Sequence, residues 1–234
     1  MPKQLPYYPK DGKQYDRITA VLDYFPPPPL VKWKVKVGAK EARRVSTVAM
    51  NIGTNVDEWV KADIIGKGYP KIKTQEARNC VQAYQRWRCE YQPRGLRVGE
   101  TLYDDDSFYA GTPDIFMGDT VIDVKCAARV STSYWMQVNM YNLLAKRHSI
   151  VAILQLNKDL AIYDFHERPA SDLCVQSFLG LLTAYRLYKS EDKSVTDGEE
   201  DEDDSAIDSA SGEKQEGQEV DEPKDTVPGT RGNW

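Results

Sequence analysis

Two aspartates and a lysine stand close together near the middle of the sequence. Asp114 follows a Gly-Thr-Pro turn, and Asp123 and Lys125 flank Val124 nine residues later. Carboxylate oxygens are the ligands that Mg²⁺ prefers, and few are needed because the ion retains several waters. A lysine beside such an ion can hold an attacking water and neutralise developing charge. The residues therefore predict a site for one or two Mg²⁺ or Mn²⁺ ions, ligated by Asp114 and Asp123, that hydrolyses a phosphodiester.

The three residues from Asp123 to Lys125 have the pattern expected at the end of a β-strand. Alternate side chains of a strand point to opposite faces, so Asp123 and Lys125 share one face while Val124 points into the core. The metal ligand and the ammonium therefore belong to one pocket. The carbonyl of Val124, at the strand edge, is a candidate for a further metal ligand.

Gln137 and Tyr141 follow on a segment that we predict to be helical. Residues four apart lie on the same helix face, so the amide and the phenol are neighbours. Both groups can bind a phosphate oxygen or the attacking water, or orient Lys125. Tyr134 and Trp135, one turn earlier, are candidates for a surface on which bases stack.

A long amphipathic helix is predicted from Lys40 to about Ile65, because apolar residues recur there at spacings of three and four. They are Val45, Val48, Ala49, Ile52, Val56, Trp59 and Val60. A glycine inside a helix costs about 1 kcal/mol relative to alanine. Gly53 and Thr54 therefore indicate close approach by another backbone or by substrate. Asp57 and Glu58 follow one turn later.

The remaining elements alternate in type. A second helix over 74–91 carries Arg78 on a face that contacts a phosphate backbone or simply faces solvent. Strands are predicted at 96–103, 108–116, 120–125, 150–156 and 160–165, with turns at 104–106 and 118–119. Helices are predicted at 134–146 and 171–188. This order predicts one α/β domain with a mixed central sheet flanked by helices.

Composition divides the chain into three parts. Residues 1–39 are a polar lead-in with a rigid proline-rich connector, 40–190 are the folded core, and 191–234 are an acidic tail. The tail holds 16 acidic and 4 basic residues, against 20 acidic and 27 basic before it. The tail cannot bury enough apolar surface to fold, so we predict disorder. The basic body suits a phosphate-binding protein.

Cysteine spacing and hydropathy limit the other classes of function. Cys80, Cys89, Cys126 and Cys174 form no CxxC pair, so we expect reduced thiols rather than a zinc site or redox dithiol. No apolar run approaches the roughly 18 residues that span a bilayer, and no secretory signal opens the chain. We expect a soluble cytoplasmic protein that does not associate with membranes.

The motifs GTPD, IDVK and QVNMY, in this order, resemble those of the PD-(D/E)xK nuclease superfamily, specifically its RecB-like branch, which includes phage exonucleases. The resemblance covers roughly Arg17 to Phe165 and implies a restriction-endonuclease-like fold. Relatives carry a metal-binding histidine after Gly-Thr on the first core helix. Asp57 takes that place here, with Glu58 as the adjacent alternative. Some relatives place an acidic residue near the metal where this chain has Glu100, although a solvent-facing role fits Glu100 equally well.

The resemblance implies a metal-dependent DNA exonuclease acting on DNA ends in recombination, repair or replication, with a viral origin and the host cytoplasm as further expectations. A structure-specific endonuclease of the same fold and an inactive DNA-binding accessory protein are the alternatives. Some relatives hold an iron–sulfur cluster with three closely spaced late cysteines. This chain has only Cys174 there, so we predict no cluster. The acidic tail either keeps the protein soluble, competes with DNA, or contacts a recombinase or single-stranded-DNA-binding protein. The oligomeric state is left open.

Overall fold

The strand that carries Asp123 lies in the middle of a five-stranded sheet. A computed structural model describes residues 5–146 and 149–196. Neighbouring strands of this sheet run in the order β3, β6, β7, β8 and β9, and only β7 and β8 are parallel. Their bounds are Leu96–Val98, Ile115–Met117, Thr120–Lys125, Ile150–Leu156 and Tyr163–Pro169. The predicted mixed sheet is confirmed.

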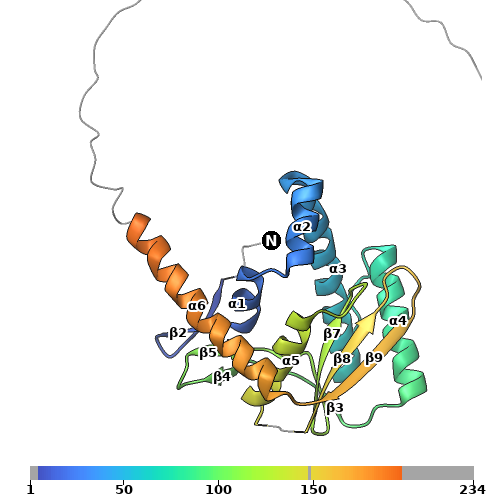
Figure 1. Ribbon diagram of the computed structural model, residues 1–234. Helices are drawn as coiled ribbons and strands as arrows, with labels where there is room; N and C mark the ends of the chain where they lie inside the picture. The colour runs from blue at the N-terminus through green and yellow to red at the C-terminus, as the bar shows by residue number, and fades with distance from the viewer. Residues whose placement is uncertain (1–4, 147–148, 197–234) are drawn as a thin grey trace, which may run out of the picture. The chain divides into compact units, whose positions relative to one another are not determined.

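Helices cover both faces of this sheet (Figure 1). On one face lie α3 (Ala39–Ile65) and α4 (Gln75–Tyr91), and on the other lies α5 (Thr132–Leu144), packed with α1 (Ile18–Tyr24) and α6 (Asp172–Thr196). The alternation along β7 follows these layers, because Val121 packs with α5 while Ile122 packs with α3 and α4. A parallel pair needs a crossover, and α5 supplies it between β7 and β8. The result is a mixed α/β fold.

A second, four-stranded sheet contains residues that the sequence suggested were a loose lead-in, and that prediction was wrong. Its order is β1 (Tyr7–Lys10), β2 (Lys13–Arg17), β5 (Tyr109–Gly111) and β4 (Leu102–Asp104), with β2 and β5 parallel. Tyr15 is only 1% exposed and packs edge-on against Tyr103. Burial of this hairpin depends on partners about ninety residues away in sequence, so local composition gave no sign of it.

Two segments that we predicted as single strands are each divided between the two sheets. The segment 96–103 breaks into β3 and β4 around Gly99, and 108–116 breaks into β5 and β6 around Pro113. Pro113 has no N–H with which to continue a ladder. The Gly99 N–H instead donates to the carbonyl of Asp114 at 3.1 Å. The interruption holds the Asp114 backbone at the junction of the two sheets.

The proline run and the chain's final helix also differ from expectation. Pro26 to Pro29 do not form only a rigid connector, because α2 (Pro28–Val37) begins within them. Proline is tolerated in the first helical turn, where its missing N–H has no partner to lose. The last helix extends to Thr196, six residues into the predicted tail. The remainder of that tail lies outside the described residues.

The other predicted helices are confirmed within a few residues, and Ile18–Tyr24 form a further helix, α1. The strand predicted from Leu160 begins at Tyr163. The reason is that the side chain of Asn157 accepts from the N–H groups of Asp159 and Leu160 and stabilises a wider turn. Within the described ranges, no helix is both long enough and apolar enough to cross a bilayer.

Candidate active site

The open edge of β7 brings the two predicted aspartates together. Pairing between β6 and β7 ends at Ile115 and Ile122, whereas β7 continues to Lys125 beside β8. Asp114 precedes β6 and occupies the vacated edge, where its Oδ2 accepts a hydrogen bond from the Val124 N–H at 2.7 Å. The N–H and C=O of one strand residue project from the same edge. The Val124 carbonyl therefore also lies on the side of Asp114.

Asp123 and Lys125 share one face of β7. The Nζ of Lys125 lies 2.8 Å from Asp123 Oδ2; Asp123 is fully buried, and the Lys125 side chain is 19% exposed. Apart from this ion pair, Oδ2 has no hydrogen-bond partner within the described part of the chain. Asp123 thus keeps one buried oxygen available as a ligand.

Helix α5 places Gln137 and Tyr141 over this pair. It begins after Ser131, whose hydroxyl accepts from the Tyr134 N–H at 3.4 Å. The Gln137 amide contacts Asp123 Oδ1 at 3.2 Å and the Tyr141 hydroxyl at 2.8 Å, both as donor. The two residues predicted to share a helix face are therefore in contact with each other and, through Gln137, with Asp123.

Burial and mutual repulsion disfavour ionisation of the two aspartates. Burial, followed by the negative charge of Asp123, raises the pKa of Asp114 to about 7. The pKa of Asp123 is also raised, again mainly by burial, although Lys125 opposes this shift. Two neighbouring carboxylates that resist ionisation are stabilised by a cation between them. Such raised pKa values are typical of functional sites.

Lys125 and Tyr141 both retain their protons in this environment. Burial alone lowers the pKa of Lys125, but the charges of Asp123 and Asp114 outweigh that effect and raise it. The pKa of Tyr141 is raised well above its usual value by burial and by the same carboxylates. Lys125 therefore acts as a fixed positive charge, and Tyr141 as a neutral phenol. The ring of Tyr134 lies 5.0 Å from Lys125 Nζ and covers that side of the pocket.

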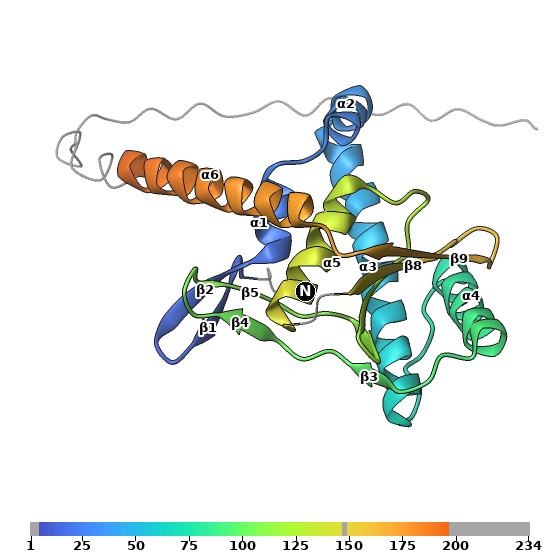
Figure 2. The same cartoon turned by 60° about the horizontal axis from the view of Figure 1, so that its bottom comes forward.

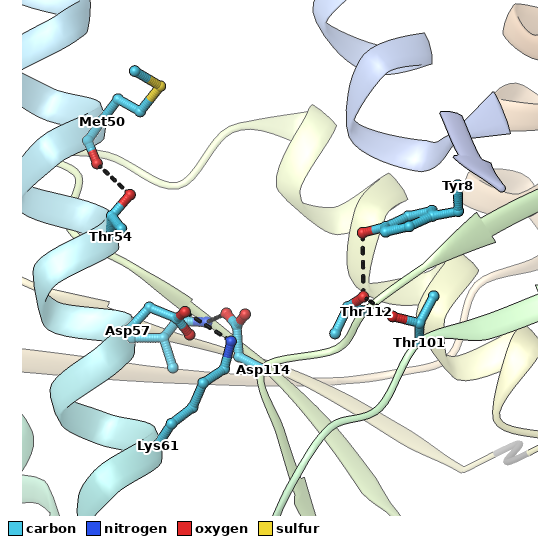
Figure 3. A network of polar contacts seen from close by, with 9 residues as sticks. Tyr8, Met50, Thr54, Asp57, Lys61, Thr101, Thr112 and Asp114 are labelled. Atoms are coloured by element: carbon cyan, nitrogen blue, oxygen red, sulfur yellow. Dashed lines mark hydrogen bonds and ion pairs between the residues drawn. The ribbon is translucent and has the colours of Figure 1, made fainter. Parts of the chain in front are cut away.

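Asp57 approaches the pair from α3, in the opposite helix layer (Figure 3). Its charge raises the pKa of both Asp114 and Asp123, so it lies within electrostatic reach of them. Its Oδ2 is 2.7 Å from Lys61 Nζ, one turn along the helix. Thr54 lies one turn before Asp57 and donates to the Met50 carbonyl at 3.0 Å. Glu58 lines a separate cavity of about 360 Å³ against α4.

The chemistry of the donors fits a divalent cation at Asp114 and Asp123. Within residues 5–146 and 149–196, no group of three or more His, Cys, Asp or Glu side chains is close enough to enclose a metal ion. A Mg²⁺ ion that keeps most of its waters needs only one or two carboxylates. Asp123 Oδ2, which faces the Lys125 ammonium, and the raised pKa values of both aspartates fit that need, with Asp57 positioned nearby.

Several predicted site residues lie away from this pocket. Trp135 is 7% exposed and packs in the core with the Arg168 guanidinium 4.2 Å above its ring, so the prediction that it stacks on bases was wrong. Glu100 is exposed in the link between β3 and β4, and Arg78 is exposed on α4; neither contacts the aspartate pair. Apart from its chain neighbours and the backbone of its own helix, no atom of the described chain lies within 4 Å of a Cβ added at Gly53, which excludes close approach by another described backbone.

Sequence reasoning missed residues that the N-terminal segments bring to the site. The Tyr8 hydroxyl lies 3.2 Å from Thr112 Oγ1, which lies 2.8 Å from Thr101 Oγ1 (Figure 3). This chain of hydroxyls braces the turn before Asp114. Asp23 on α1 is acted on by the charge of Lys125, and partial burial raises its pKa. The contact between Tyr8 and Thr112 depends on sheet pairing between distant segments, which no local signal in the sequence revealed.

Gly111 and Gly53 give opposite predictions for substitution by alanine. A Cβ at Gly111 would lie 2.4 Å from the Tyr141 ring and 2.8 Å from Ile18, so Gly111→Ala must displace the site tyrosine. We expect a loss of about 1–3 kcal/mol in the free energy of unfolding, as for other overpacked cores. Gly53→Ala enters open space on a helix and should gain up to about 1 kcal/mol. Chemical denaturation measures both, and equal effects would contradict the packing described here.

Comparison with known proteins finds likeness at the level of three-dimensional structure only. No family model matches the sequence, and no curated protein matches it significantly. An alkaline exonuclease from Laribacter hongkongensis aligns with a TM-score of 0.43 and 13% identity over 62% of this chain and 84% of its own. A phage-related exonuclease from Haemophilus somnus aligns with a TM-score of 0.39 and 13% identity, over 61% and 82% respectively. With so few residues shared, the chemistry of the site has to be inferred from its own side chains.

Proposed function

We propose that the protein is a Mg²⁺- or Mn²⁺-dependent deoxyribonuclease, most simply an exonuclease that removes nucleotides from DNA ends. One observation supports this above all. Asp114 and Asp123 meet at the open edge of β7, with Lys125 held 2.8 Å from Asp123 and both aspartates shifted toward higher pKa. A purely structural role gives no reason to place two carboxylates that repel each other side by side, one of them fully buried.

The residues that would hold the ion are Asp114, Asp123 and the Val124 carbonyl, with Asp57 approaching from α3. When bound, a divalent ion supplies polarisation of a phosphoryl oxygen and a nucleophilic water at neutral pH. Asp57 is held by Lys61, and this 2.7 Å ion pair has to rearrange if the carboxylate is to become a ligand.

Lys125 and α5 account for the remaining chemistry. Lys125 stays protonated, so it positions a water or phosphate oxygen and neutralises charge that builds there, rather than removing a proton. Gln137 holds Asp123 and the Tyr141 hydroxyl in place through its amide. Because Tyr141 keeps its proton, its phenol serves as a donor toward a phosphate oxygen.

The form of DNA that is cut separates the proposed exonuclease from its alternatives. Purified protein is incubated with end-labelled linear DNA and with covalently closed circular DNA, each with Mg²⁺ or with EDTA. Digestion of linear DNA only, abolished by EDTA, is the expected result. Cleavage of circles would indicate an endonuclease. Binding without any cleavage in Mg²⁺ or Mn²⁺ would contradict the enzymatic proposal and favour a DNA-binding accessory protein.

The acidic tail adds a regulatory proposal to this function. Residues 197–234 contain 14 acidic and 3 basic residues, so the tail can compete with DNA for the basic body or recruit a recombinase or a single-stranded-DNA-binding protein. A chain ending at Thr196 should bind DNA several-fold more tightly at low salt, with a difference that shrinks as salt rises. Fluorescence anisotropy over a salt series measures this. Unchanged affinity would leave the tail only a solubilising or partner-binding role.

A further inference from the structure

Helix α2 and the first half of α3 form a hairpin that projects from the body of the protein (Figures 1 and 2). Between residues 28 and 51 only Ala42 is buried, and from Ile52 onward α3 enters the core. We call residues 28–50 the basic arm. Helices of globular proteins normally bury an apolar stripe. A helical hairpin that buries almost nothing within the described chain has a surface suited to a partner.

The charge of the basic arm favours an anionic partner. It carries six basic residues and one acidic residue, and that residue, Glu41, is held by Arg44 at 2.7 and 2.8 Å. The other five cations form no ion pair within the described residues; they are Lys32, Lys34, Lys36, Lys40 and Arg43. Cores of protein–protein interfaces are depleted in lysine. A polyanion therefore fits this surface better than another protein does.

A groove in the basic arm gives the anion a defined place. A cavity of about 590 Å³ lies between α2 and α3, with Lys34 on one wall and Arg43 and Ser46 on the other. Lysine, arginine and a hydroxyl are the side chains that most often contact nucleic-acid phosphates. The groove therefore has the donors needed for backbone contacts, which require no base sequence.

One face of α3 joins this groove to the candidate active site. Arg43 and Asp57 are fourteen residues apart, close to four full turns, so they lie on nearly the same face. Met50 and Thr54 lie between them, and Figure 3 shows Met50, Thr54 and Asp57 along one side of the helix. At 1.5 Å per residue the separation is about 21 Å. For a strand whose bases are stacked, with about 3.4 Å per nucleotide, that corresponds to roughly six nucleotides.

Resting on the nuclease function proposed above, we propose that the basic arm binds the sugar–phosphate backbone of the DNA strand whose reacting phosphate lies at Asp114 and Asp123, about six nucleotides from that phosphate. The strand follows the face of α3 through Thr54. Asp23 lies at the junction of the two regions, since the charges of both Lys125 and Lys34 act on it. The arm thereby sets how long a strand must be to bind fully.

The test is the dependence of DNA affinity on strand length. Fluorescence anisotropy in EDTA compares single-stranded oligonucleotides of about four and about twelve nucleotides. The double variant Lys34→Ala/Arg43→Ala should lose roughly tenfold in affinity for the longer strand and little for the shorter. Its salt slope for the longer strand should fall by about 1.4, the value for two lost phosphate contacts. The matched control, Lys67→Ala/Lys71→Ala, removes two exposed lysines beyond the opposite end of α3 and should leave both affinities unchanged.

Three results would overturn the proposal: wild-type affinity in the arm variant, an equal loss for short and long strands, or the same loss in the control. A self-association that the arm variant abolishes, with DNA affinity intact, would also overturn it and point to a second copy as the partner. Because binding is measured without metal, its result does not depend on cleavage, and the arm proposal and the nuclease function can be rejected separately. Arm-dependent binding by a protein that never cleaves DNA would contradict that function alone.

Discussion

Replacing Lys125 by alanine should lower the rate of DNA cleavage about a thousand-fold. The expected size is that of a lost acid–base or electrostatic group in the reacting pocket. Lys125 is the cation 2.8 Å from the buried Asp123, and no other lysine or arginine in the described chain forms an ion pair with that carboxylate. The measurement is the single-turnover release of labelled nucleotide from linear DNA in Mg²⁺.

Folding has to be measured beside activity, because Lys125→Ala leaves Asp123 buried without its partner. Loss of one member of a buried ion pair costs about 3–5 kcal/mol. Lys125→Gln retains a donor of similar length and serves as a second variant whose thermal unfolding is compared with wild type. Lys67→Ala, at an exposed position after α3, is the control for loss of one positive charge. A folded Lys125→Gln protein with full activity would contradict the role given to the ammonium.

Neutralising Asp114 should stabilise the metal-free protein while it abolishes cleavage. The pKa of Asp114 is raised to about 7 in the folded state, against about 3.9 for an unperturbed aspartate. The folded state therefore binds this proton more tightly than the unfolded state does. The stability that this bound proton contributes is fully present below about pH 4 and is lost as the pH rises toward 7. The asparagine of Asp114→Asn carries no such proton, so the stability of this variant should not fall in this way as the pH rises.

In EDTA at pH 8, Asp114→Asn should exceed the wild type in unfolding free energy by on the order of 2–4 kcal/mol, and at pH 4 the two should be nearly equal. Asparagine can still accept from the Val124 N–H, so the packing is retained. Added Mg²⁺ should narrow the difference, because only the wild type is stabilised by binding. Urea denaturation across this pH range measures the effect. A variant less stable than wild type at pH 8 would show that Asp114 has a structural role instead.

The sequence predicted the part of the site that depends on local spacing. Alternation along a strand places Asp123 and Lys125 on one face with Val124 in the core, and helical spacing places Gln137 beside Tyr141; the structure shows both arrangements. These geometries follow from backbone periodicity alone, so they need no knowledge of distant contacts.

The parts that the sequence did not predict all depend on pairing between distant segments. Tyr8 comes to Thr112 only because β2 pairs with β5 across most of a hundred residues. An aromatic residue at the position of Trp135 suits a DNA-facing surface, but Trp135 lies in the core. The helices packed against α5 decide which of its residues face the core. The division of 108–116 between two sheets likewise depends on which partners its halves find.

The most direct test is nucleotide release from end-labelled linear DNA in Mg²⁺ by the wild type, Asp123→Asn and Asp106→Asn, purified side by side. Asp123 is fully buried at the open end of β7, whereas Asp106 is exposed in the turn between β4 and β5. The pair therefore separates loss of a site carboxylate from loss of a surface charge. We predict cleavage by the wild type and Asp106→Asn, and none by folded Asp123→Asn. Undiminished cleavage by Asp123→Asn would contradict the assignment of this site.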